Sequence, residues 1–181
     1  MNVYFSGMIG SGKTTLGERV ARDLRLEFFD LDREMDRRLG YSFHRLVHEK
    51  GWLPFRELEY SICKFFAGLT DAVICLGGGT VRYEWNIDVL RPTGVFILLD
   101  VPLSELVRRV RTADRPRVNE GVSLEEDISI IWEKGKHRYY GTADIVLASG
   151  QKSVDQETAE IETLILGDSR FSALRVARPG R

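Results

Sequence analysis

The sequence predicts an α/β domain in which helices cover both faces of a parallel β-sheet. Short apolar runs alternate with helical patterns along the chain, and several of these runs contain no polar residue. Strands that are buried on both faces have this continuous apolar character. The alternation of strands and helices favours right-handed crossovers, and a length of 181 residues fits one compact domain.

Five apolar runs are candidate strands. Ligands of open parallel sheets bind beyond the carboxyl ends of the strands, so the residues that follow each run are candidates for a site. The runs cover residues 3–5, 27–29, 72–76, 95–99 and 145–147.

Helical patterns fill the intervals between the runs. Apolar residues recur at fourfold spacing after Lys13, and a second pattern forms one apolar face of a helix that Pro54 can open at its first position. The two sets are Leu16, Val20 and Leu24, and Phe55, Leu58, Ile62, Phe65 and Leu69. Capping-box spacing predicts two further helix starts, at Ser123 with Glu126 and at Ser153 with Gln156.

Composition and charge exclude several classes of protein. The 26 Lys and Arg residues nearly balance 27 Asp and Glu residues, and a net charge of −1 argues against a general nucleic-acid or membrane-surface binder. No stretch approaches the ~18 apolar residues of a membrane helix, and residues 2–7 do not resemble a signal peptide. Cys63 and Cys75 lie in apolar segments, so we expect buried, reduced thiols and a cytoplasmic protein.

A phosphate-binding loop follows the first run and opens the first helix. Residues 7–15 read G-M-I-G-S-G-K-T-T, which satisfies G-x-x-x-x-G-K-[ST]. Glycines allow successive N–H groups to point at phosphate oxygens, and the helix N-terminus adds partial positive charge. Lys13 would reach the β- and γ-phosphates, and Thr14 would take one position on Mg²⁺. The loop therefore predicts a nucleoside triphosphate site, for which the candidate residues are Gly10, Ser11, Gly12, Lys13, Thr14 and Thr15.

Polar residues follow the second run. Alternation along a strand would point Asp30 and Asp32 in one direction, where one carboxylate can order Mg²⁺ waters and the other can accept a proton from an attacking hydroxyl. Alternatively, Asp32 caps the helix that begins at Arg33.

Two further candidate groups follow. Arg56 and Glu59 lie three residues apart and can pair on one helix face, although such a pair can also be merely solvated. Gly77, Gly78 and Gly79 follow the third run and permit close approach of a ligand to the backbone.

Five arginines fall within ten residues, at positions 108, 109, 111, 115 and 117. This segment has the character of a mobile lid, residues 112–123, that brings guanidinium groups onto phosphates. A solvated basic face and a nucleic-acid patch are the competing interpretations, but the patch would require interleaved aromatic residues.

Together these features resemble the shikimate kinase family over residues 3–165. The resemblance rests on G-M-I-G-S-G-K-T, F-D-L-D, P-F-R-E-L-E, L-G-G-G-T and D-R-P, in the family's order. It implies a three-layer α/β/α fold with a five-stranded parallel sheet, a P-loop NTPase of the nucleoside-monophosphate-kinase type. It also implies ATP with Mg²⁺ as donor and phosphorylation of the shikimate 3-hydroxyl.

The resemblance also implies roles for individual residues. Asp32 would bind ring hydroxyls and act as the base, Arg56 would grip the substrate carboxylate, and Gly78 would contact the substrate. Arg115 would stabilise the transferring phosphoryl group, and Arg108 would stack on adenine. Asp30 would be a second-shell magnesium partner, and Glu59 would orient Arg56.

One departure concerns a second arginine clamp on the carboxylate, near the end of the helix after the lid. Alignment on Tyr140 puts Lys136 there, alignment on Ala143-Asp144 puts Gly135 there, and Arg138 can also reach in. Lysine offers a point charge in place of a bidentate fork. Two hypotheses therefore stay open beside shikimate kinase: a kinase of another cyclitol or sugar acid such as gluconate, and a non-catalytic ATP-binding regulator. We expect a monomeric kinase domain over residues 1–166 and a disordered basic tail over 167–181.

Overall fold

The structure, a computed structural model, describes residues 1–111 and 117–176. Five parallel strands form one sheet in the order β2-β3-β1-β4-β5. Their bounds are β1 Asn2–Ser6, β2 Glu27–Asp30, β3 Ala72–Cys75, β4 Gly94–Asp100 and β5 Ile145–Ala148. The predicted strands are therefore confirmed, with ends that differ by one residue.

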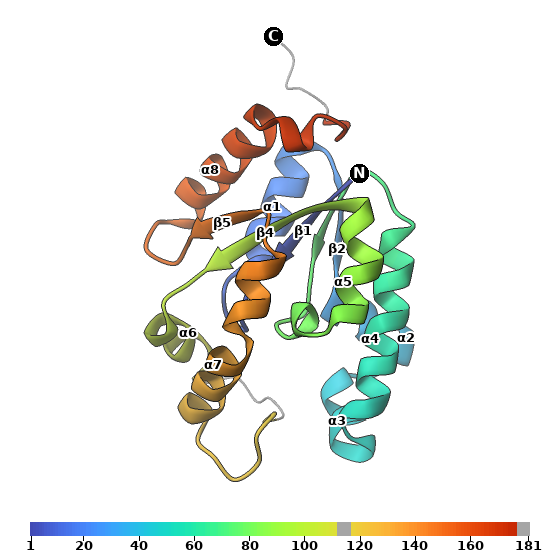
Figure 1. Cartoon of the computed structure of the whole chain (residues 1–181), viewed down its shortest axis with the longest axis vertical. Coiled ribbons are helices and arrows are strands. Elements are labelled where there is room, and N and C mark those ends of the chain that lie inside the picture. The colour runs from blue at the N-terminus through green and yellow to red at the C-terminus, as the bar shows by residue number, and fades with distance from the viewer. Residues whose placement is uncertain (112–116, 177–181) are drawn as a thin grey trace.

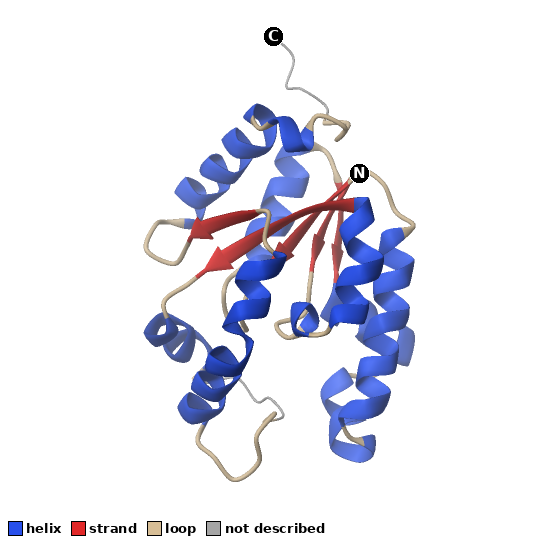
Figure 2. Cartoon of the chain, viewed as in Figure 1, coloured by secondary structure: helices blue, strands red, loops and turns tan. Residues whose placement is uncertain are grey.

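Helices lie on both sides of the sheet and complete the three-layer arrangement (Figures 1 and 2). The α-helices are α1 Lys13–Leu24, α2 Leu31–Leu39, α3 Phe43–Lys50, α4 Trp52–Ala67, α5 Glu84–Leu90, α6 Leu103–Val110, α7 Leu124–Thr142 and α8 Val154–Gly167. Three short 3-10 helices are η1 Thr80–Arg82, η2 Arg91–Thr93 and η3 Ser169–Phe171.

Each face of the sheet has its own core. On one face, α1 packs against β1, β2, β3 and α8, and Leu16, Val20 and Ile161 belong to this core. On the other face, α4, α5 and α7 pack on Tyr4, Ile74 and Phe96. Both cysteines are buried and free, and burial raises their pKa values, so the thiols stay protonated.

The strands at the two edges differ from the central three. Residues of β5 alternate between buried and exposed, and Val146 is about half exposed, whereas β1 and β3 are buried throughout.

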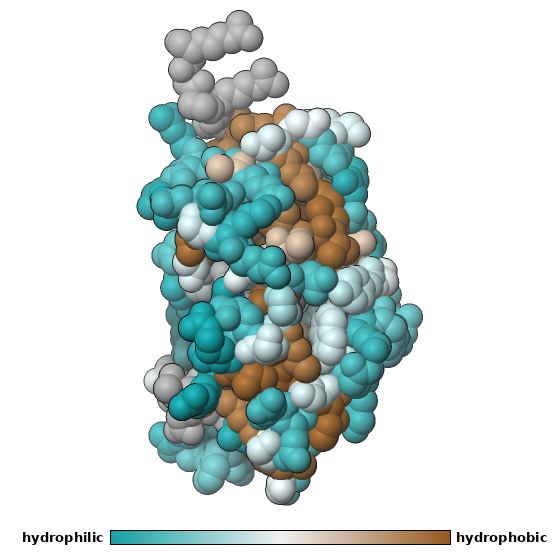
Figure 3. Space-filling view, turned by 90° about the vertical axis from the view of Figure 1, so that its left-hand side faces the viewer, coloured by the Kyte–Doolittle hydropathy of each residue, from teal (hydrophilic) through white to brown (hydrophobic). Residues whose placement is uncertain are grey.

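Figure 3 views the side of the molecule that is on the left in Figure 1, and hydrophobic residues there lie among hydrophilic ones. No helix in the described part of the chain is both long and apolar enough to cross a membrane.

Local signals predict most helix starts. Both capping boxes are present, and Ser123 and Ser153 each accept a hydrogen bond from the third residue of the helix. The predicted start of α4 is wrong, because the helix begins at Trp52 and Pro54 is its third residue. Proline is tolerated there since the first four N–H groups of a helix have no intrahelical acceptor.

The predicted apolar face of α4 is correct only in part. Phe55 and Ile62 are buried, but Phe65 is exposed and Leu69 lies beyond the helix. The buried stripe continues instead through Glu59, Cys63 and Phe66. A buried glutamate within this stripe already suggests a polar network inside the domain.

The predicted start of the disordered tail, residue 167, lies too early in the chain. Phe171 and Leu174 are buried against the α1/α8 core, so residues 168–176 pack on the domain, while 177–181 lie outside the described residues. Asp71 accepts a hydrogen bond from the Arg175 backbone and lies 3.7 Å from the N-terminal amino group. The beginning and the end of the described chain therefore meet beside the amino ends of the strands.

Candidate active site

Two cavities adjoin at the carboxyl ends of the strands. One is lined by the P-loop, Asp30, Arg109, Lys152 and Glu157. The other lies between α3 and α4 on one side and α7 on the other, and its lining includes His44, Arg56, Arg82, Arg117 and Asp127 (Figure 1). Ile9, Asp32 and Gly78 line both cavities, so Asp32 lies at their junction. We call them the nucleotide cavity and the acceptor cavity.

The P-loop curves as the glycine pattern predicts. Gly10 and Gly12 have φ angles of 77° and 92°, a region that favours glycine. The Lys13 ammonium lies within the loop and donates to the carbonyls of Gly7 and Met8, at 3.0 and 2.9 Å. A helix N-terminus, a curled backbone and an ammonium group thus converge on one anion site.

Asp30 and Asp32 lie next to the loop, but not in the strand geometry expected. β2 ends at Asp30, and Asp32 is the second residue of α2. Asp30, not Asp32, caps this helix by accepting from the Arg33 N–H at 3.1 Å. The capping interpretation of Asp32 is therefore wrong, and its side chain faces the cavities.

Thr14 and Asp30 form a pair that suits magnesium. The Thr14 hydroxyl donates to the Asp30 carboxylate at 2.6 Å beside the P-loop. No cluster of three or more His, Cys, Asp or Glu side chains with metal-site geometry occurs within the described ranges. Mg²⁺ that travels with a nucleotide needs only one or two protein ligands besides phosphates and water, so this pair fits it.

Arg56 and Glu59 are a buried pair and not a solvated one. Their side chains are 12% and 1% exposed, and Arg56 Nη1 lies 2.8 Å from Glu59 Oε2. Glu59 also accepts from Thr80 at 2.8 Å and from Asn86 at 3.2 Å. These contacts leave Glu59 fully hydrogen-bonded, which is what a buried carboxylate requires.

Aromatic rings complete the setting of Arg56. Its guanidinium carbon lies 4.3 Å from the ring centre of Tyr83, 4.7 Å from Phe55 and 5.2 Å from Trp52. Such contacts stabilise a cation and restrict its rotation. Arg56 is therefore held in one orientation at the wall of the acceptor cavity.

The glycine segment after β3 joins the two cavities. A Cβ atom on Gly78 would lie 3.0 Å from the Ile9 backbone nitrogen of the P-loop, which is closer than side chains normally approach. Tyr139 of α7 donates to the Gly78 carbonyl from the buried side. Burial raises the pKa of Tyr139, so the hydroxyl stays a donor. The backbone of this segment thus forms the floor between the cavities.

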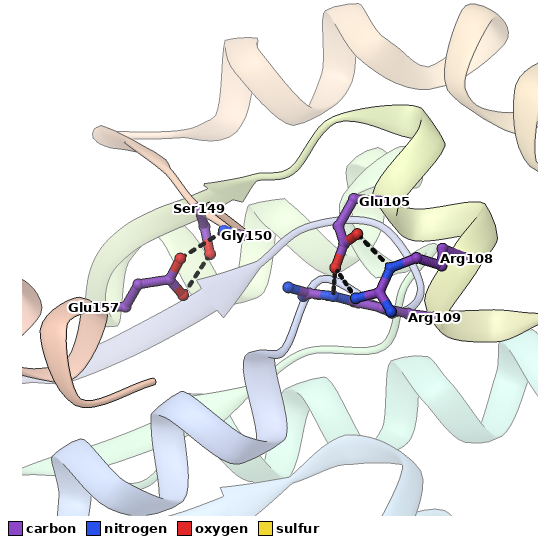
Figure 4. A network of polar contacts seen from close by, with 7 residues as sticks. Glu105, Arg108, Arg109, Ser149, Gly150 and Glu157 are labelled. Atoms are coloured by element: carbon purple, nitrogen blue, oxygen red, sulfur yellow. Dashed lines mark hydrogen bonds and ion pairs between the residues drawn. The ribbon is translucent and has the colours of Figure 1, made fainter. Parts of the chain in front are cut away.

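The structure brings Arg109 to the nucleotide cavity, and Arg108 does not line it (Figure 4). Arg109 donates to the Gly10 carbonyl at 3.2 Å, whereas the Arg108 side chain is 73% exposed. Hydrogen bonds from Arg108 and Arg109 lower the pKa of Glu105 to about 2, so this carboxylate is ionised at neutral pH. Arg109, and not Arg108, therefore lines the nucleotide cavity.

A second polar cluster closes the far end of the nucleotide cavity. Glu157 of α8 is 4% exposed and accepts from Ser149 at 2.8 Å and from the Gly150 N–H (Figure 4). These contacts tie the turn after β5 to α8. Neither Glu157 nor Ser149 belongs to a local motif, which is why sequence reasoning missed them.

Other predicted residues lie elsewhere. The structure does not bring Lys136 into the acceptor cavity: its ammonium pairs with Glu133 at 2.7 Å on the exposed side of α7. Arg138 lies 3.6 Å from Glu84 and is also exposed. Arg115 lies outside the described residues, so its place is not part of this geometry. Sequence reasoning missed Arg82, which lines the acceptor cavity.

A P-loop at the end of β1, the strand order 2-3-1-4-5 and an adjoining acceptor cavity define a P-loop kinase of small molecules. The family model "Shikimate kinase" matches residues 9–165. The chain therefore belongs to the shikimate kinase family and is a phosphotransferase that acts on an alcohol group. Its fold is the P-loop, nucleoside-monophosphate-kinase-like fold that the sequence predicted.

Individual relatives agree with this assignment. A shikimate kinase of Chlorobium luteolum is 33% identical over 175 residues, which is 90% of this chain and 86% of the relative. A bifunctional shikimate kinase/3-dehydroquinate synthase of Thermotoga maritima is 37% identical over 77% of this chain but only 27% of its own length. The solved shikimate kinase of Acinetobacter baumannii, in complex with shikimate, superimposes with a TM-score of 0.86 at 26% identity and covers 93% of this chain and 94% of that one.

Proposed function

We propose that this chain transfers the γ-phosphoryl group of ATP to the 3-hydroxyl of shikimate. The observation that carries the proposal is the position of Asp32, which lines both cavities next to the P-loop. A hydroxyl that lies in the acceptor cavity can there meet a carboxylate on one side and a terminal phosphate on the other. Phosphoryl transfer needs mainly such positioning and charge stabilisation.

The nucleotide would bind along the P-loop. Backbone N–H groups of Gly10, Ser11 and Gly12 and the helix N-terminus at Lys13, Thr14 and Thr15 would hold its phosphates. Lys13 would exchange its carbonyl contacts for phosphate oxygens and stabilise the charge that develops. Thr14 and Asp30 would hold Mg²⁺, which neutralises phosphate charge when it is bound.

The acceptor would be held by its carboxylate and its hydroxyls. Arg56, fixed by Glu59 and three aromatic rings, would bind the carboxylate. The backbone of Gly77, Gly78 and Gly79 would contact the ring, and Asp32 would accept the proton of the attacking hydroxyl. Arg115 would approach the transferring phosphoryl group from the segment after α6, as the family resemblance implies.

The proposal extends to the cellular compartment and the oligomeric state of the protein. Buried, protonated thiols are compatible with a reducing compartment, and we assign the chain to the cytoplasm. The proposal also includes a monomeric enzyme. Light scattering coupled to size-exclusion chromatography tests the second point.

An acceptor panel tests the function. ADP formation from ATP and Mg²⁺ is measured with shikimate, gluconate and several cyclitols, each against a control without acceptor. We expect shikimate to accelerate ADP formation and to appear as a monophosphate ester by phosphorus NMR. Acceleration by gluconate or a cyclitol alone would assign a different acceptor, and tight ATP binding without transfer to any acceptor would favour a regulator.

A further inference from the structure

Arg82 of η1 is a cation of the acceptor cavity that no local motif predicts. Its side chain is half-buried and lines the cavity together with Arg56 and Asp32. Within the described ranges, 1–111 and 117–176, Arg82 forms no ion pair, whereas Arg56 is paired with Glu59. Two guanidinium groups of this wall thus differ: Arg56 has a counter-charge in Glu59, and Arg82 has no such partner among the described residues.

The two guanidinium groups converge on Gly79. A Cβ atom at this glycine would lie 3.4 Å from Nη2 of Arg56 and 3.9 Å from Nη1 of Arg82. Both groups are therefore within 4 Å of one point on the cavity floor. A planar carboxylate that approaches this point can accept hydrogen bonds from two guanidinium forks.

Gly135 of α7 provides the space that the Arg82 side chain occupies. A Cβ atom at Gly135 would lie 3.3 Å from Cδ and 3.4 Å from Cγ of Arg82, and 3.2 Å from the Tyr139 ring. These distances are tighter than most side-chain contacts. The stem of Arg82 therefore lies directly over a helix position that has no side chain.

Two carboxylates that line the cavity, Glu59 and Asp127, do not neutralise Arg82. Glu59 is engaged with Arg56, Thr80 and Asn86. Asp127 accepts from the backbone of Val118 and from Asn119. An anionic group of the substrate is thus the partner that the charge distribution favours at this end of the cavity.

We infer that Arg82 binds the substrate carboxylate together with Arg56, and that Gly135 allows Arg82 to lie there. This inference rests on the proposed function, because shikimate supplies the carboxylate. It assigns a specificity role to η1, and Lys136 then has no part in the clamp.

The test compares shikimate with its methyl ester, which keeps the ring and the hydroxyls but lacks the negative charge. Arg82→Ala and Arg82→Gln are measured with both acceptors at saturating ATP, beside Arg22→Ala, an exposed arginine of α1, as the control. Loss of hydrogen bonds to a charged group predicts a rise in the KM for shikimate of roughly 10- to 100-fold. We expect the KM for ATP and the kcat/KM for the ester to stay unchanged, so that the preference for shikimate over the ester collapses.

Gly135→Ala provides a second measurement that does not depend on truncating Arg82. The added methyl group should displace Arg82 and raise the KM for shikimate several-fold. Because it would also lie 3.2 Å from the buried Tyr139 ring, the melting temperature is measured beside the KM. In the double variant Arg82→Ala/Gly135→Ala the methyl group should raise the KM less than it does in the parent chain, since part of its effect acts through Arg82.

Each outcome decides the inference. Equal losses with shikimate and ester in the Arg82 variants, or no loss at all, would overturn it while the wild-type activity leaves the proposed function intact. If Lys136→Ala loses the preference for shikimate over the ester and Arg82→Ala keeps it, then Lys136 of α7, and not Arg82, binds the carboxylate. A wild-type protein that fails to phosphorylate shikimate would remove the proposed function and the inference with it.

Discussion

The two cavities are built in different ways. Half of the residues that line the nucleotide cavity are consecutive, 9–16, and the backbone carbonyls of Gly7 and Met8 hold the Lys13 ammonium. The acceptor cavity draws its charged groups from α2, α4, η1 and α7, which are far apart in the sequence. A backbone site depends little on side-chain identity, whereas a site assembled from distant side chains can change its ligand through single substitutions. Variation in acceptor specificity is therefore expected in the second cavity.

The largest effect is expected where the two cavities meet. Asp32→Asn removes the proposed base and should reduce kcat by roughly 10²- to 10⁴-fold. The KM for ATP should change little, because the P-loop is untouched. The measurement is steady-state ADP formation, with Asp88→Asn on the exposed side of α5 as the control. An Asp32→Asn variant with normal turnover would separate the carboxylate from the chemistry.

In the nucleotide cavity, Lys13 is the side chain on which turnover should depend most. Lys13→Met should lower turnover on the order of 10²-fold or more, since it removes a group aimed at developing charge. ATP affinity, measured by calorimetry, should fall as well. Lys134→Met, an exposed lysine of α7, should behave like the parent chain. Unaltered turnover in Lys13→Met would mean that the loop backbone alone suffices.

The acceptor cavity should also be sensitive to the network behind it. Glu59→Gln leaves Arg56 as a buried cation without its counter-charge, and breaking such a pair lowers the free energy of unfolding by about 3 kcal/mol. The KM for shikimate should rise more than that for ATP. Urea unfolding and kinetics measure both effects.

Glu133→Gln is a matched control for that variant, because Glu133 and Lys136 form an exposed pair with the same spacing. An exposed pair contributes about 0–1 kcal/mol. Similar losses of stability in the two variants would show that the Arg56–Glu59 pair is no more important than a surface pair.

The smallest expected effect distinguishes two adjacent arginines. Arg109 donates to the P-loop backbone and lines the nucleotide cavity, and Arg108 does neither. Loss of one hydrogen bond predicts a several-fold rise in the KM for ATP for Arg109→Ala. Arg108→Ala should leave it unchanged. The reverse result would restore the role that the family resemblance implies for Arg108.

Local sequence patterns predicted those strands and helix starts that neighbouring residues determine. Apolar runs located all five strands, and the capping boxes located the starts of α7 and α8, because each signal lies within a few residues of the structure it specifies. Pro54 misled because the first four N–H groups of a helix have no intrahelical acceptor, so proline fits at several of these positions and the pattern alone does not choose among them. Phe171 and Leu174 pack against residues more than a hundred positions away, so the basic composition around them suggested a tail.

The residues of the candidate site also separate into those that local spacing predicts and those that only the fold brings together. The P-loop and the Arg56–Glu59 pair were predicted from spacing, and Thr14 and Asp30 were predicted separately as magnesium partners. Arg82 and Glu157 were not, because their importance arises only when η1 lies over α7 and α8 approaches the turn after β5. No residue near Arg82 marks it as part of a site. In the sequence, Gly135 suggested only that a second arginine for the substrate carboxylate is missing. In the structure, the side chain of Arg82 lies where a side chain at position 135 would lie.

The meeting of the two described chain ends at Asp71 has a practical consequence. Both ends lie at the amino ends of the strands, opposite the edge where the two cavities open. A fluorescent fusion or a surface linker attached at Met1 or after Val176 would therefore leave the cavities facing solution. Enzyme immobilised at either of these two described positions should keep full access to both reactants.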